Sequence, residues 1–117
     1  MDLTTVSDIL TATTRDGGVT VNGTGIVRPT RGFAVGTQRG TFRKLGWYTD
    51  LTSFHIALSD AMAVDGTGHA GTWLQGTTIH VDPVRIVGDL DIALAIARIT
   101  EQETIFDFAR GEAITVL

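Results

Sequence analysis

The stretch that decides the expected fold covers residues 71–116 and reads GTWLQGTTIHVDPVRIVGDLDIALAIARITEQETIFDFARGEAITV. Extended runs at 72–74 and 77–82 flank a short glycine turn, a pattern typical of a β-hairpin. Pro83 lacks a backbone N–H, so it belongs at a strand end or an edge. We therefore expect the run at 84–87 to form a separate extended piece.

A helix and a second hairpin complete this stretch. Asp89 precedes an alanine-rich run at 90–99, and a carboxylate in that position accepts hydrogen bonds from the first free amides of a helix. Farther on, runs at 104–108 and 112–116 flank a turn at Arg110-Gly111. The sequence therefore predicts a ββαββ unit over residues 71–117.

Residues 1–70 contain the same kinds of signal at less regular intervals. Apolar residues at helical spacing alternate with β-branched runs and with glycine-rich breaks. From these signals we expect a helix over 2–14, a strand at 19–23, extended pieces at 26–29 and 32–36, an irregular exposed segment at 37–50, a helix over 52–64 capped by Thr52 or Ser53, and a glycine loop at 65–71.

These elements predict an α+β fold. Strands joined by short glycine turns must be antiparallel, because a parallel pair needs a crossover of about a dozen residues or more. The expected architecture is a mainly antiparallel sheet with about three helices covering one face. At 117 residues, the chain is expected to form a single domain, 1–117, around one core.

Charge is unevenly distributed along the chain. The whole sequence has a net charge of −4, but residues 28–44 hold five basic residues and no acid. Residues 45–117 carry ten acids against three arginines. The basic stretch thus lies on an acidic body, which admits a local contact with a polyanion or with another protein.

Aromatic residues are interleaved with this basic stretch and with the residues just after it. Arginine and large aromatic side chains are typical of protein-binding hot spots, and they also suit phosphate contact and base stacking. Protein binding and nucleic-acid binding therefore remain open, as does a structural role with Trp47 buried and the arginines paired to acids. The candidate binding residues are Arg28, Arg31, Arg39, Phe42, Arg43, Lys44, Trp47 and Tyr48.

Several kinds of catalysis have no motif in this chain. There is no cysteine, no Gly-x-Ser-x-Gly nucleophile turn and no phosphate-binding loop before Lys44, the one lysine. Neither Gly-Thr-Gly tripeptide extends into a dinucleotide-binding fingerprint. We therefore expect a non-catalytic protein without a cofactor or a metal ion, acting by binding another macromolecule.

Two further hypotheses stay open at this point. His80 and Asp82 lie two residues apart on a predicted strand, so both point to one face and could, with His69, support a metal-assisted hydrolase. The same alternation is expected of an ordinary strand with residues 78, 80 and 82 toward solvent. The many short strands also leave edges through which a self-associating structural protein could pair with a second copy.

The sequence also bears on location. The chain begins with acidic and hydroxyl residues instead of the basic and apolar segments of a secretory signal. No run approaches the roughly 20 apolar residues of a membrane span. We expect a cytoplasmic protein without membrane contact.

The C-terminal stretch resembles small uncharacterised proteins of actinobacterial phages and mobile elements. The similarity rests on Trp73, on the Val81-Asp82 strand, on the alanine-rich helix at 93–98 and on the hairpin at 105–114. It covers about 47 residues and does not extend to residues 1–70. The resemblance implies a phage-like or mobile-element setting and no particular activity.

Overall fold

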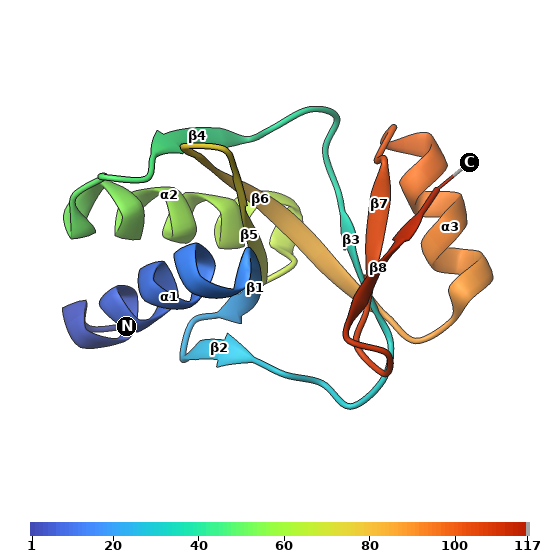
Figure 1. Ribbon diagram of the computed structural model, residues 1–117. Coiled ribbons are helices and arrows are strands. Elements are labelled where there is room, and N and C mark those ends of the chain that lie inside the picture. Colours follow the sequence, from blue (N-terminus) through green and yellow to red (C-terminus); the bar gives the residue numbers. More distant parts are fainter. Residues whose placement is uncertain (117) are drawn as a thin grey trace.

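The computed structural model describes residues 1–116 and contains three α-helices and eight strands (Figure 1). The elements in chain order are α1 (Leu3–Asp16), β1 (Gly18–Asn22), β2 (Gly25–Val27), β3 (Phe33–Gly36), β4 (Arg43–Gly46), α2 (Leu51–Ala63), β5 (Ala70–Gln75), β6 (Thr78–Val87), α3 (Leu90–Ile99), β7 (Thr104–Asp107) and β8 (Glu112–Thr115), with a 3-10 turn at Val64–Gly66. The α+β prediction is confirmed.

Each α-helix begins at an aspartate. The side chains of Asp2, Asp50 and Asp89 accept hydrogen bonds from amides three residues ahead and so satisfy donors that a helix start leaves free. Asp89 is the predicted position. For α2, the prediction of Thr52 or Ser53 is wrong, because Asp50 accepts from the Ser53 amide at 2.7 Å and the helix starts earlier.

All strands pair antiparallel and form one curled sheet in the order β2-β1-β5-β6-β3-β7-β8, with β4 paired to β6 as well. The ten-residue strand β6 connects the two ends of this sheet. Its first part pairs with β4 and β5, and its last four residues pair with β3.

The prediction of two extended pieces separated by Pro83 is corrected by this continuous strand. Pro83 forms the last pair of the β5–β6 ladder, opposite Ala70, so the missing N–H falls where the ladder ends. Strand β6 then continues with β3 as its new partner.

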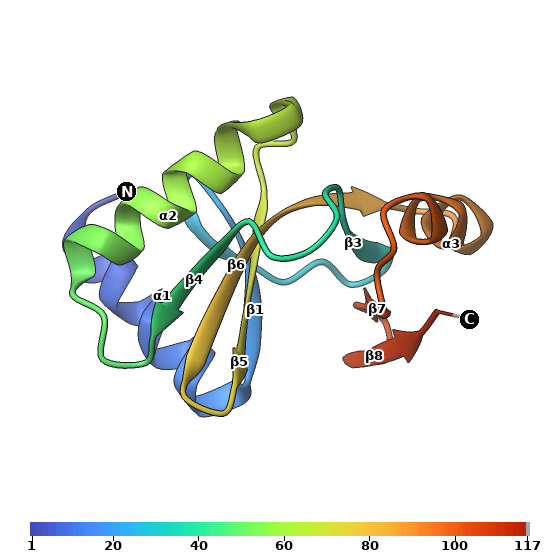
Figure 2. The same cartoon turned by 90° about the horizontal axis from the view of Figure 1, so that it is seen from above.

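The helices pack on one face of the curled sheet. Along β6, Ile79 and Val81 contact the cluster under α1 and α2, whereas Val87 contacts the cluster under α3. These positions differ by even numbers, so they share a face of the strand. The opposite face carries His80 and Asp82 and is left without a helix (Figure 2).

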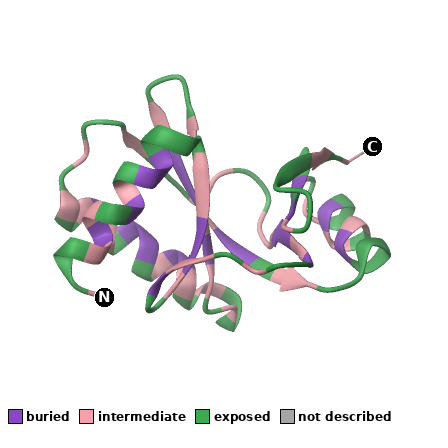
Figure 3. Cartoon of the chain, turned by 60° about the horizontal axis from the view of Figure 1, so that its bottom comes forward, coloured by how far each residue is buried: buried purple, intermediate pink, exposed green. Residues whose placement is uncertain are grey.

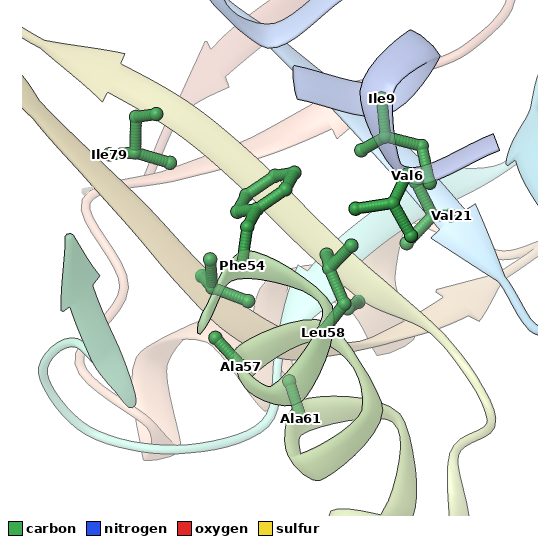
Figure 4. Packing of buried hydrophobic residues seen from close by; sticks show 10 residues of the cluster. Val6, Ile9, Val21, Phe54, Ala57, Leu58, Ala61 and Ile79 are labelled. Carbon is green, nitrogen blue, oxygen red and sulfur yellow. The ribbon is translucent and has the colours of Figure 1, made fainter. Parts of the chain in front are cut away.

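Buried apolar residues form two clusters, whereas the sequence predicted one core (Figure 3). The larger cluster joins α1 and α2 to the sheet and centres on Phe54 and Leu58, both fully buried (Figure 4). The smaller cluster lies under α3 around Val35 and Ile105. Curling of the sheet separates the helices, so each end of the sheet buries its own apolar residues.

None of the helices in residues 1–116 is long and apolar enough to cross a lipid bilayer.

Candidate functional site

The helix-free face of the sheet is hollowed into a groove of about 1030 Å³ between the two ends of the molecule. Residues with small side chains or none line it from β1, β3 and β5, among them Gly18, Ala34 and Gly71. Because these positions lack bulky side chains, the curled sheet cannot fill its own concavity. We call this space the groove.

Trp73 and His80 form one wall of the groove. Their rings stack with centroids 4.0 Å apart and an angle of 13° between planes, and Thr41 Oγ1 is hydrogen-bonded to His80 Nδ1 at 2.7 Å. Trp73 is 42% exposed while His80 is 6% exposed. The expected strand alternation is thus present, but His80 does not face solvent, because the indole covers it.

Burial and nearby charges shift the pKa values of His80 and Asp82 in this wall. Burial lowers the pKa of His80, an effect that Asp82 opposes and Lys44 reinforces. The pKa of Asp82 is raised by burial, against the opposing hydrogen bonds from the Phe42 amide and the Trp73 side chain. The imidazole is therefore held toward its neutral form.

Asp82 is a partly buried carboxylate. One of its oxygens accepts from the Phe42 amide at 2.7 Å. Within the described residues, no arginine or lysine lies in salt-bridge distance of it. Desolvated charges are normally paired, so Asp82 offers an acceptor to a ligand in the groove.

The opposite wall is aromatic with an acidic rim. Phe106 and Phe108 meet edge to face with centroids 5.5 Å apart, and Phe106 is 38% exposed. Glu101 and Glu103 also belong to the lining. This wall therefore offers a ligand an apolar contact surface, and the lining near it carries negative charge.

The segment at 37–50, predicted to be irregular, contains strand β4. Its sequence Arg-Lys-Leu-Gly has no β-branched residue, so nothing local indicates a strand. Pairing with the start of β6 imposes the extended conformation, with Lys44 opposite His80 and Leu45 opposite Ile79. Strand β4 is consequently an edge strand supported by its neighbour.

Trp47 and Tyr48 occupy the tip of the turn that follows β4. The Thr49 amide donates to the Gly46 carbonyl at 3.0 Å, which places both aromatics at the central positions of a β-turn. Trp47 is 54% exposed and Tyr48 is 80% exposed, and their rings meet edge to face at 6.2 Å. The alternative of a buried Trp47 is therefore wrong.

The predicted basic residues do not gather into one surface. Arg43 reaches Asp60 on α2 at 3.5 Å, and its guanidinium lies 4.2 Å from the centre of the Phe42 ring, which packs against the larger core cluster. Arg39 reaches Glu101 at 3.8 Å. Arg28 lines the groove, whereas the connection that carries Arg31 runs along the opposite side of the molecule from β4 (Figure 1).

The histidines do not converge either. The His69 ring is hydrogen-bonded to the Thr67 carbonyl at 3.0 Å, in the glycine loop before β5. The described part of the chain holds no group of three histidines or carboxylates arranged to bind a metal ion. The geometry therefore gives the metal-assisted hydrolase hypothesis no ligand set.

Sequence reasoning missed the aromatic walls of the groove. Trp73 and Phe106 lie on strands that were predicted, and Phe108 falls in the turn just after β7, one residue beyond the strand. Their convergence depends on the curl of β6. One signal was available in the sequence. Gly71 and Trp73 lie two residues apart and so share a face of the strand, where the glycine leaves space beside a large aromatic side chain.

The His80 environment predicts a pH dependence of stability. Because the pKa of His80 is lowered in the folded chain, the unfolded chain takes up the proton more readily. The free energy of unfolding should fall as pH drops from about 6.5 toward the folded pKa. Asp82 acts with the opposite sign at lower pH, since its raised pKa favours the protonated folded state.

Urea titrations at pH 7.5 and 5.5 test this effect in the wild type and in His80→Gln. The loss of stability between the two pH values should be smaller in the variant. An equal loss in both proteins would show that His80 is not its source.

Comparisons with protein-family models, curated proteins and solved structures give no match to this chain.

Proposed function

We propose that this protein is a non-catalytic accessory protein that binds another protein through Arg43, Lys44, Trp47 and Tyr48, which we call the platform. The observation that carries this proposal is the exposure of Trp47, at 54%, at the tip of a hydrogen-bonded turn. Covering a large exposed aromatic ring with a partner removes apolar surface from water, which favours binding.

The platform has the composition of a binding hot spot. Tryptophan, tyrosine and arginine are the residues most enriched where interfaces concentrate their binding energy. Lys44 adds a second positive charge on the other face of β4, which it shares with His80 in β6. Arg43 already contacts Phe42 and Asp60, so its guanidinium is held in place before a partner arrives.

A protein partner agrees better with this geometry than nucleic acid does. Phosphate binding requires several cations on one surface, and the affinity scales with the number of phosphates neutralised. Here the arginines of residues 28–44 are divided between opposite sides, and two of them contact acids. The resemblance of the C-terminal stretch supports a phage-like or mobile-element setting.

Capture from a lysate of the source organism tests the proposal. The bait proteins are the wild type, the platform variant Trp47→Ala/Tyr48→Ala and a control variant, Ile92→Ala/Ile99→Ala. The control removes exposed apolar residues of α3, which lies at the other end of the molecule from β4 (Figure 1). Quantitative mass spectrometry should find a protein that the wild type and the control retain and that the platform variant loses about tenfold or more.

Three results would contradict the proposal. The first is capture of the same proteins by all three baits, which would show that the platform binds none of them. The second is loss of the captured material on nuclease treatment, which would favour nucleic acid. Light scattering provides the third test. A wild-type dimer that Trp47→Ala/Tyr48→Ala converts to a monomer would assign the platform to self-association.

A further inference from the structure

The geometry points to a second binding site: we infer that the groove takes an extended peptide segment carrying arginine or lysine between apolar residues. The groove is separate from the platform, and its lining includes neither Trp47 nor Tyr48. This inference therefore goes beyond the proposed function and can fail independently of it.

The size and lining of the groove suit a peptide. About 1030 Å³ is at the upper end of the volumes that small-molecule pockets reach. Glycines from five segments of the chain contribute to the lining, so no side chain occupies the groove at these positions. An extended peptide is narrow enough to lie along a surface of this kind and places its side chains alternately on two sides. The lining glycines are Gly17, Gly18, Gly36, Gly40, Gly71 and Gly111.

The charge of the lining selects a cation. It contains four acids, Asp16, Asp82, Glu101 and Glu103, against a single arginine, Arg28. Asp16 and Glu101 contact arginines of the chain. In the described residues, Asp82 and Glu103 form no salt bridge, so two negative charges remain for a ligand.

These two carboxylates belong to different walls. Asp82 lies on β6 in the wall that Trp73 and His80 form, and Glu103 precedes β7 in the opposite wall. His80 beside Asp82 contributes little positive charge, since burial lowers its pKa. Lys44 shares the face of His80 but is not part of the lining. A basic side chain entering between the walls would neutralise charge that the protein leaves unpaired.

The aromatic residues of the groove favour a ligand that carries apolar side chains next to its cation. Trp73 and Phe106 are each more than a third exposed although they line a concave surface. One face of the Trp73 indole stacks on His80, and a cationic or apolar side chain can cover its other face. Nucleic acid fits poorly because acids outnumber arginine by four to one in the lining.

Tryptophan fluorescence tests this inference directly. The chain has two tryptophans, so Trp47→Phe leaves Trp73 as the sole reporter. The probe is an acetylated, amidated hexapeptide of alternating leucine and arginine, about 20 Å long when extended. The comparison ligands are the same peptide with glutamate in place of arginine, and free arginine amide as a small cation.

The leucine–arginine peptide should change the Trp73 emission in a saturable titration. In the same Trp47→Phe background, Asp82→Asn should weaken binding about tenfold, and Phe106→Ala, on the opposite wall, about fivefold. Asp8→Asn removes an exposed carboxylate of α1 outside the groove and should leave the affinity within about twofold. Circular dichroism of each variant checks that it is folded.

The inference is overturned if no saturable change occurs or if the glutamate peptide binds as well as the arginine peptide. Binding of arginine amide as tight as that of the peptide would instead assign a site for small cations. None of these outcomes bears on the platform, whose test depends on Trp47 and Tyr48. Conversely, loss of platform capture would leave the Trp73 titration unchanged.

Discussion

Replacing Phe54 by alanine is expected to lower the free energy of unfolding by about 3–5 kcal/mol, the range found when a buried phenylalanine is truncated. Phe54 is fully buried on α2 and lies among side chains of α1 and the sheet, including Val6 and Ile79 (Figure 4). Truncation removes apolar area from the core and leaves a cavity whose lining loses contacts on one side. Urea denaturation followed by circular dichroism measures the loss.

Ile56→Ala is the matched control for this substitution. It truncates a large apolar residue two positions along the same helix, but Ile56 is 56% exposed. Its effect should stay within about 0.5 kcal/mol, as for most surface substitutions. Similar losses in Phe54→Ala and Ile56→Ala would mean that α2 does not present this face to the core.

Gly18→Ala is expected to cost about 2–3 kcal/mol, although it adds a single methyl group. A Cβ at this position would overlap the carbonyl oxygen of Thr72 and lie 3.2 Å from the Cα and Cβ atoms of Trp73. Two of these three contacts are backbone atoms of β5, which pairs with β1 at this point. The strands must therefore separate or shift, because no rotamer change relieves the overlap.

Gly23→Ala is the control for Gly18→Ala. Gly23 lies in the turn between β1 and β2, has no atom within 4 Å of an added Cβ and does not adopt a positive φ. Alanine there should be neutral or slightly stabilising, since it reduces the freedom of the unfolded chain. Thermal unfolding of the two variants separates the effects. A Gly18→Ala protein as stable as the wild type would contradict the β1–β5 packing.

Local signals were sufficient for the helices and for most strands. Aspartates at helix starts, the glycine that ends α1 and glycine turns between β-branched runs act within a few residues, so a single sequence is enough to recognise them. Gly17 illustrates this: it follows α1 with φ of 91°, and its amide bonds the Thr13 carbonyl. The expected irregular segment contained β4 because that strand depends on pairing with residues 78–81, more than 30 positions away.

The candidate sites divide in the same way. Trp47 and Tyr48 could be selected from the sequence, because large aromatics between glycine and a helix cap fit poorly into a regular element. Their exposure is nevertheless a result of tertiary structure, since the turn at Gly46–Thr49 projects from the edge of the sheet. The grouping of Arg28–Lys44 as one basic surface failed, because neighbours in sequence were carried to opposite sides.

The sequence by itself determined the α+β class, the helices and the antiparallel pairing, because spacing, caps and turns are local properties. Tertiary structure alone decided that the basic stretch would be dispersed and that His80 would be buried beneath Trp73. It also decided that two aromatic walls would face each other across a groove. These outcomes depend on the continuous strand β6 and the curl of the sheet around it, a geometry set by long-range pairing.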